Sequence, residues 1–147
     1  MSQNPAWIYN QSGVIPYRHT ARGIELMLIT SRKRKRWVIP KGIVERHLSP
    51  AASAVQEAWE EAGLSGDVSA EPVGLYRYQK WGGTCRVKVF LLRVEAVAET
   101  WPESAIRSRE WVNVSEAAQR VNEPDLKQII LSLPEKLEVV DHENSRD

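Results

Sequence analysis

The apolar residues of this chain recur with two different periods, and each period predicts one type of element. Short apolar or alternating runs bounded by turn residues predict strands. These runs cover residues 13–17, 24–30, 68–81, 84–94 and 109–112. Gly82-Gly83 lies between the third and fourth runs, where such a pair predicts a hairpin turn. Arg86 and Lys88 alternate with valines in the fourth run, so we expect one solvent-facing side over its first half.

The clearest helix signal lies between Ser49 and Gly63. Ser is favoured at the N-cap, Pro at the first helical position, and Gly in the left-handed conformation that ends many helices. Helical spacing gathers the apolar residues on one side, which we expect to face the core. This side carries Ala51, Ala54, Val55, Ala58, Trp59 and Ala62.

Three acidic residues, Glu57, Glu60 and Glu61, share the other side of this predicted helix. Like charges at these spacings repel, the helix dipole disfavours acids in the last turns, and residues 50–62 contain no Lys or Arg. A solvated acidic face is one interpretation. The other is a site for a divalent cation, and Mg²⁺ suits a few carboxylates combined with water and phosphate oxygens.

Two shorter helices are predicted after the last strand. Ser115 is the expected N-cap of a helix over 116–121, and Pro124 opens a second helix over 125–133. Strands on both sides of a central helix, followed by C-terminal helices, predict an α/β (α+β) fold with a mixed sheet between helices. We expect a single domain over residues 1–147, with loose tails at 1–6 and 138–147.

Composition restricts the classes of function. A net charge of +1 argues against a general attraction to nucleic acid or to an anionic membrane, so electropositive function must be local. The single cysteine, Cys85, excludes an intramolecular disulfide. No long apolar run and no leader-like segment are found, which predicts a cytoplasmic protein without a membrane partner. The sequence leaves the oligomeric state open.

The segment from Gly42 onwards resembles the Nudix signature, G-x5-E-x7-R-E-U-x-E-E-x-G-U, in which U is a bulky aliphatic residue. The matching positions are Gly42, Glu57, Glu60, Glu61, Gly63 and Leu64. Ala58 is a weak match for the aliphatic position, and Leu48 and Gln56 stand where the family has Glu and Arg. The resemblance implies an α/β/α sandwich that hydrolyses a diphosphate linked to another group, assisted by Mg²⁺ or Mn²⁺.

The same resemblance implies roles for individual residues. Glu57, Glu60 and Glu61 would bind the metal, with Gly42 in the loop that approaches it and one glutamate serving as general base. The two departures leave a second possibility open, a non-catalytic Nudix-fold module that binds a nucleotide or phosphate. Glu45 could replace the carboxylate missing at position 48 only if the loop is rebuilt.

Five consecutive cations occupy residues 32–36, directly before the signature. They form either an exposed solubilising loop or a phosphate clamp; a nucleic-acid patch fits the neutral net charge less well. Ser31-Arg32, Arg36-Trp37 and residues 109–111 are similar to the diphosphoinositol polyphosphate phosphohydrolases, which cleave inositol pyrophosphates and dinucleoside polyphosphates. That similarity implies polyphosphate-binding residues, namely Arg32, Arg36, Lys41, Lys80 and Arg109.

Three further features leave alternatives open. Glu99 and Glu103 are either extra acids of the site or part of an exposed acidic loop, and the loop is the favoured interpretation. Trp81 and Trp101 lie at a turn and in a loop, where an indole ring could stack on a nucleobase. Removal of a terminal diphosphate from RNA 5′ ends is a third function, which needs a wider nucleic-acid path than five cations suggest.

Overall fold

The computed structural model describes residues 7–144, with side chains described to residue 138. Within this part of the chain, eight strands form one mixed sheet with the central order β3-β2-β1-β7-β5, while β4 pairs with β1, β6 with β7 and β8 with β2. The strands are β1 (Ile8–Thr20), β2 (Gly23–Thr30), β3 (Trp37–Val38), β4 (Lys41–Ile43), β5 (Leu64–Val68), β6 (Gly74–Lys80), β7 (Gly83–Val97) and β8 (Arg109–Asn113). The pairing of β1 with β7 is parallel and the other pairings are antiparallel.

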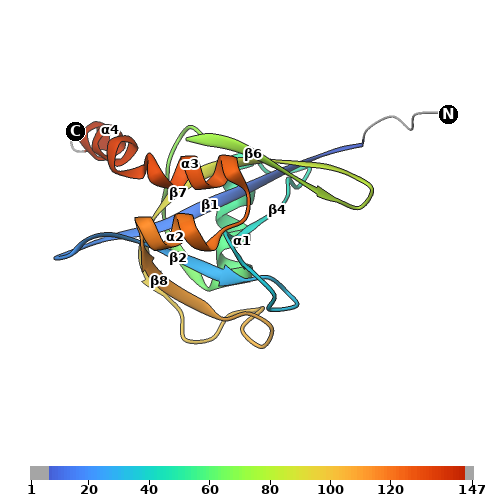
Figure 1. Cartoon of the computed structure of the whole chain (residues 1–147), viewed down its shortest axis with the longest axis horizontal. Coiled ribbons are helices and arrows are strands. Elements are labelled where there is room, and N and C mark those ends of the chain that lie inside the picture. Colours follow the sequence, from blue (N-terminus) through green and yellow to red (C-terminus); the bar gives the residue numbers. More distant parts are fainter. Residues whose placement is uncertain (1–6, 145–147) are drawn as a thin grey trace.

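Helices cover both faces of this sheet (Figure 1). They are α1 (Pro50–Ala62), α2 (Val114–Arg120), α3 (Pro124–Leu131) and α4 (Leu133–Asn144). The buried residues accordingly form two clusters, one between the sheet and α1 and one between the sheet and the C-terminal helices. The predicted mixed sheet between helices is confirmed.

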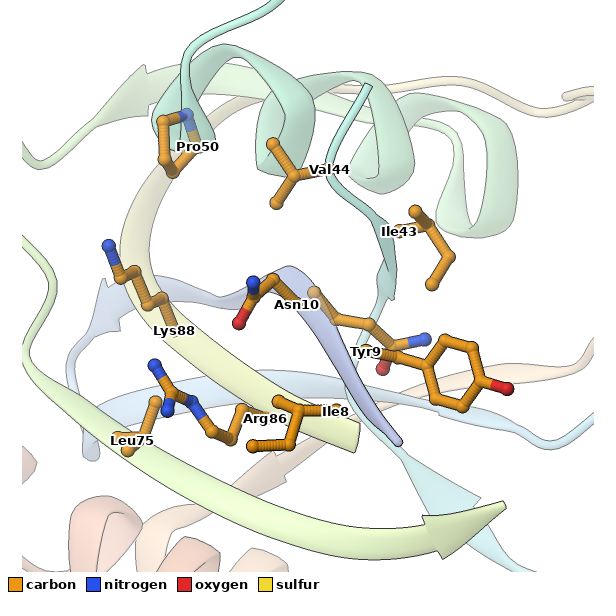
Figure 2. A pocket seen from close by; sticks show the side chains of 10 residues that line it. Ile8, Tyr9, Asn10, Ile43, Val44, Pro50, Leu75, Arg86 and Lys88 are labelled. Atoms are coloured by element: carbon orange, nitrogen blue, oxygen red, sulfur yellow. The ribbon is translucent and has the colours of Figure 1, made fainter. Parts of the chain in front are cut away.

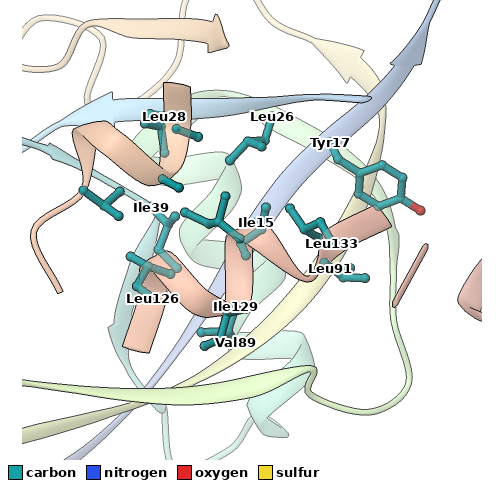
Figure 3. Packing of buried hydrophobic residues seen from close by; sticks show 14 of the residues in the cluster. Ile15, Tyr17, Leu26, Leu28, Ile39, Val89, Leu91, Leu126, Ile129 and Leu133 are labelled. Atoms are coloured by element: carbon teal, nitrogen blue, oxygen red, sulfur yellow. The ribbon is translucent and has the colours of Figure 1, made fainter. Parts of the chain in front are cut away.

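Strand β1 contributes side chains to both hydrophobic clusters because neighbouring residues of a strand point to opposite faces of the sheet. Val14 packs in the cluster that contains Ala54 and Ala58 of α1. Ile15 packs on the other face, in the cluster that contains Leu126 of α3, as Figure 3 shows. Strand β1 therefore contributes side chains to the core on both faces of the sheet.

The ends of α1 are as the sequence predicts. The Ser49 side chain accepts a hydrogen bond from the backbone N–H of Ala52 at 3.1 Å, and Gly63 follows the helix at φ 67°. The predicted apolar side is only partly buried, however. Ala54, Ala58 and Ala62 recur every four residues, are fully buried and form the stripe that contacts the sheet. Trp59, by contrast, is 44% exposed. Trp59 is exposed because its position, one residue after Ala58, is turned about 100° away from that stripe.

The strands differ from their predicted limits because tertiary pairing extends or divides them. Parallel pairing from Ile8↔Thr84 to Tyr17↔Arg93 lengthens both β1 and β7. Of the predicted strand 68–81, residues 74–80 form β6, and only Val68 belongs to β5, a strand that the sequence did not predict. Both β5 and β6 pair with successive parts of β7. Pro72 lies in the break between them and cannot donate a ladder hydrogen bond.

Two predicted turns are also displaced. Register pairs Lys80 with Gly83, so the hairpin turn consists of Trp81 and Gly82, with φ of 55° and 70°. The sequence had placed this turn at Gly82-Gly83. The predicted loop glycine, Gly42, lies in β4 and pairs with Ser12 of β1.

The C-terminal helices begin and end differently from the prediction. Asn113, not Ser115, caps α2, because its side chain accepts a hydrogen bond from the Glu116 N–H at 2.8 Å. Helix α4 continues to Asn144, although the sequence predicted a loose tail from residue 138. Leu133 and Leu137 are buried at spacing four and anchor this helix on the core. Residues 1–6 and 145–147, predicted as tails, lie outside the described part.

Candidate active site

A cleft of about 550 Å³ lies between the C-terminal half of α1, strand β4, the basic loop before β3 and the β6–β7 hairpin. It gathers eight of the nine site residues that the sequence predicts. They are the acids Glu57, Glu60 and Glu61, the cations Arg32, Arg36, Lys41 and Lys80, and Gly42. Segments far apart in the sequence thus form one site with both acidic and basic walls.

Gly42 is required by close packing against a carboxylate. A Cβ atom at this position would lie 2.3 Å from the carboxyl carbon of Glu57 and 2.4 Å from one of its oxygens. Strand β4 is therefore pressed against the acidic side of α1 only because residue 42 has no side chain. The signature glycine and the signature glutamate form a single packing unit here.

We expect Gly42→Ala to leave the fold largely intact but to displace the Glu57 carboxylate. The clash involves the far end of a flexible side chain, which can rotate away at little cost in stability. Because the resemblance implies that Glu57 binds the metal, metal-dependent activity should then fall by about 10–100-fold, a typical cost of changing a residue that orients a ligand. Thermal unfolding and Mg²⁺-dependent turnover are the measurements. A variant with the parent's Mg²⁺-dependent turnover would contradict the proposed contact.

Glu61 is the most buried of the three acids, with 8% of its surface exposed. One carboxylate oxygen accepts a hydrogen bond from the Lys41 backbone N–H at 3.1 Å. The other lies 3.3 Å from a guanidinium nitrogen of Arg107. Glu61 thus links α1 to β4 and to the segment before β8, and its orientation is fixed before any ligand binds.

Arg107 is the principal site residue that sequence analysis missed. Its guanidinium is 7% exposed, donates to Glu103 at 2.9 Å and to the Thr30 carbonyl at 3.0 Å, and pairs with Glu61. Glu103, taken as part of an exposed acidic loop, lines the cleft instead. Arg107 precedes β8 in an irregular segment, so no periodic signal marks it as buried.

Gln56 occupies the position of the signature arginine and makes a local contact. Its side-chain amide donates to Glu60 at 3.0 Å, a hydrogen bond between residues one helical turn apart. At the other departure, Leu48 is half-buried and carries no ligand atom, while Glu45 lines the cleft. Glu45 therefore places a carboxylate in this region of the site.

The electrostatics of the cleft show an excess of negative charge on α1. Burial, followed by the neighbouring carboxylates of Glu61 and Glu60, raises the pKa of Glu57 to about 8. Burial also raises the pKa of Glu61, although the guanidinium of Arg107 opposes this shift. Burial lowers the pKa of Lys41 to about 8, against the attraction of Glu61. A bound cation would relieve the repulsion among the acids.

The donor chemistry of these acids fits Mg²⁺ or Mn²⁺, since both ions prefer carboxylate oxygens. As placed, no three His, Cys, Asp or Glu side chains of the described residues are arranged as a ready-made metal site. Glu60 is held by Gln56 and Glu61 by Arg107. The acids therefore offer the right atoms on one wall, and side-chain rotation must complete a coordination shell.

The basic loop divides into residues that face the cleft and residues that hold the loop. Arg32 and Arg36 line the cleft, each within 4 Å of one acid, Glu103 at 3.8 Å and Glu123 at 3.9 Å. Arg34 instead donates to Ser108 at 2.5 Å and to the Ala105 carbonyl at 3.3 Å. Lys80 lies above the ring of Trp81, with its ammonium 4.7 Å from the ring centre.

The structure does not bring Arg109 to this cleft, contrary to the prediction that it binds polyphosphate. Its guanidinium donates to the carbonyl of Ala62 at 2.6 Å and to that of Ala98, and lies 3.9 Å from the ring centre of Trp101. Trp101 in turn donates to the Glu61 carbonyl at 2.9 Å. Both side chains therefore satisfy carbonyl groups at the end of α1, where a cation is favourable.

Known proteins resemble most of this chain in sequence. Residues 11–133 match the family described as the NUDIX domain. The chain is 37% identical over 113 residues to Nudix hydrolase 21, chloroplastic, of Arabidopsis thaliana, covering 73% of this chain and 57% of that protein. It is 29% identical over 116 residues to diphosphoinositol polyphosphate phosphohydrolase 3-alpha of Homo sapiens, covering 78% of this chain and 70% of that protein. The chain spans between 57% and 64% of the length of the first three curated relatives.

Solved structures share the architecture at low sequence identity. The Ap4A hydrolase of C. elegans matches with a TM-score of 0.74 and 19% identity, over 89% of this chain and 99% of that chain. The NUDIX domain of Shewanella oneidensis NrtR, complexed with ADP ribose, matches with a TM-score of 0.69 and 12% identity, over 88% of each chain. At these identities the likeness establishes the fold.

Proposed function

Since the chain belongs to the NUDIX domain family, we propose that it is a metal-dependent hydrolase of a diphosphate linkage in a highly phosphorylated small molecule. A dinucleoside polyphosphate and an inositol pyrophosphate are the two substrate classes we favour. One observation carries the proposal: three glutamates and four cations line a single cleft. Relatives named Ap4A hydrolase and diphosphoinositol polyphosphate phosphohydrolase support it.

The four cations, Arg32, Arg36, Lys41 and Lys80, are proposed to bind the phosphate groups. Arg suits this role because its guanidinium offers paired donors to phosphate oxygens. Arg32 and Arg36 have exposed side chains whose ion pairs with Glu103 and Glu123 are long, so both can turn towards a more highly charged partner. A substrate dense in negative charge uses all four.

The three acids are proposed to hold Mg²⁺ or Mn²⁺. Glu57, Glu60 and Glu61 would bind the ion, which when present neutralises the diphosphate and lowers the pKa of a bound water. The protein's own contribution is orientation: Arg107 fixes Glu61, and Gln56 fixes Glu60. One of the three glutamates is also proposed as the general base.

A second candidate function is a non-catalytic module that binds a nucleotide or phosphate. It is favoured by Leu48 and Gln56, which replace the signature Glu and Arg. Against it, Glu45 brings a carboxylate to the cleft and Arg107 supplies a buried cation to the acids. The site thus retains both kinds of charge that the two departures remove, and we favour the enzyme.

Release of phosphate or nucleotide from a substrate panel tests both candidates. The panel contains diadenosine polyphosphates, inositol pyrophosphates, ADP-ribose and nucleoside triphosphates, each with Mg²⁺ or Mn²⁺. We expect turnover of the first two classes, and its near-complete loss in Glu60→Gln. If no substrate of the panel is turned over by a folded protein that still binds a nucleotide, the enzyme hypothesis is rejected and the binding module is favoured. Turnover retained in Glu60→Gln would overturn the site.

Among the helices of the described residues, none has the length and apolar character of a membrane span. We propose a cytoplasmic location from the sequence, although relatives include proteins named as chloroplastic and mitochondrial. A single domain over residues 1–147, acting on a small molecule without nucleic acid, is proposed on the same basis.

A further inference from the structure

A second cavity, also of about 550 Å³, opens on the α1 face of the sheet beside the first turn of α1. Figure 2 shows its walls, formed by β1, β4, β6, β7 and Pro50. Gln11 and Ile43 are the two lining residues that it shares with the catalytic cleft. Among the residues that the structure describes, no acid lines this second cavity, so it differs chemically from the cleft on the other side of β4.

Two cations face this cavity without a counter-ion. Arg86 and Lys88 lie two residues apart in β7 and therefore on one face of the sheet (Figure 2). In the portion of the chain that the structure describes, neither residue forms an ion pair. Register also places Arg77 of β6 opposite Arg86, where a like charge is unfavourable. The uncompensated positive charge favours an anion.

Hydrogen-bond donors on the same face are also unsatisfied. The Nε of Arg86 and the hydroxyl of Ser12 are buried and have no hydrogen-bond partner among the described residues. Ser12 is fully buried and pairs in register with Lys88, while Asn10 pairs with Arg86. Buried polar groups without partners are rare in folded proteins. Of the two residues, Arg86 lines the cavity, so an acceptor group of a ligand would satisfy an otherwise unpartnered donor there.

The rim of the cavity is apolar. Ile8 is 53%, Ile43 45% and Leu75 36% exposed, although each is a large aliphatic side chain. These residues come from three different strands; in Figure 2 Ile8 and Leu75 lie on the two sides of Arg86, and Ile43 lies across the cavity. A ligand with an apolar body would cover them while its charged group reaches the floor. The volume is in the range of small-molecule sites.

We propose that this cavity is a second binding site, for a small organic anion that carries a phosphate or carboxylate group on an apolar body. The anionic group binds Arg86 and Lys88, with the Asn10 amide beside them. The apolar body packs against Ile8, Ile43 and Leu75. Two cations in one open cavity favour a single charged group, whereas a nucleic-acid backbone requires a longer basic path.

Backbone amide NMR titration tests the proposal with phenyl phosphate, benzoate and, as the uncharged probe, phenol. We expect saturable changes in the amide chemical shifts of residues 8–10, 43–44 and 86–88 with at least one anion. The changes with phenol should be much smaller. Phenyl phosphate alone would assign a phosphate group, and benzoate alone a carboxylate. Shifts confined to the catalytic cleft, or none at these amides at millimolar probe, would overturn the proposal.

Matched variants of strand β7 sharpen the test. Lys88→Gln changes an exposed side chain and should weaken anion binding about tenfold, the cost of one charge-assisted contact. Arg86→Gln should weaken it at least as much. Arg93→Gln is the control, because Arg93 lies on the same strand but pairs with Asp67 outside the cavity. Equal affinity in Lys88→Gln and the parent would refute the site, even if Arg86→Gln fails to fold.

Discussion

Glu57→Gln is expected to lower kcat/KM for the diphosphate substrate by about a thousandfold in the presence of Mg²⁺. The amide has nearly the shape of the carboxylate, so the packing against Gly42 is preserved while the charge of one proposed metal ligand is lost. Steady-state turnover of the best substrate in the panel is the measurement. Glu99→Gln is the matched control, because Glu99 is exposed and lies outside the cleft. Unchanged turnover in Glu57→Gln would contradict the assignment.

The same variant should be more stable than the parent when Mg²⁺ is absent. Folding raises the pKa of Glu57 to about 8, above its ordinary value of 4.5, so the folded state prefers the protonated carboxyl. This residue's contribution to stability is therefore lost as pH rises from 4.5 through 8. Gln is neutral throughout, so its melting temperature in EDTA should exceed the parent's at pH 8 and approach it near pH 5. Added Mg²⁺ should stabilise the parent much more than the variant.

Local sequence rules were sufficient for α1. Its N-cap, first proline and terminal glycine lie where side-chain capping and left-handed geometry require them, and each of these acts within a few residues. The signature spacing also placed the three acids and Gly42 at one site. Local capping determines the helix ends, whereas the grouping of Gly42 with the acids was implied by the resemblance to the Nudix signature.

Long-range pairing is what the sequence did not reveal. Strand β5 contains Ser65, Gly66 and Asp67, which have no strand propensity, and it exists because β7 offers an edge for antiparallel pairing. The parallel pairing of β1 with β7 joins segments more than seventy residues apart, and it extends both beyond their apolar runs. Such pairing depends on the assembled sheet rather than on local propensity.

The two arginines before and within β8 show that side-chain positions in the site also depend on long-range packing. Arg107 and Arg109 are separated by one residue and look equivalent in the sequence. In the structure Arg107 is buried against Glu61 and Glu103, whereas Arg109 caps the end of α1 over Trp101. Which of the two reaches the acids depends on how residues 98–108 are placed against α1, and no local pattern encodes that.

Arg107→Met should be the most destabilising single change in the site. It removes a cation that is 7% exposed, leaves the buried Glu61 without its cationic partner, and breaks the hydrogen bonds to the half-buried Glu103 and to the Thr30 carbonyl. Breaking a buried pair in this way typically costs about 3–5 kcal/mol. Urea unfolding should show a lower midpoint with an unchanged slope. A loss below about 1 kcal/mol, the value of an exposed pair, would contradict the burial of this network.

A second substitution and a pH series separate the electrostatic and packing contributions to the stability lost in Arg107→Met. Burial already raises the pKa of Glu61, and without Arg107 this pKa should rise further, so the variant takes up a proton as pH falls. The destabilisation by Arg107→Met should therefore shrink from pH 8 to pH 5. Adding Glu61→Gln to Arg107→Met should recover part of the loss at pH 8, because the uncompensated charge is gone. A loss that is independent of pH, with no recovery in the double variant, would mean that Arg107 acts through packing alone and does not orient Glu61 for the metal.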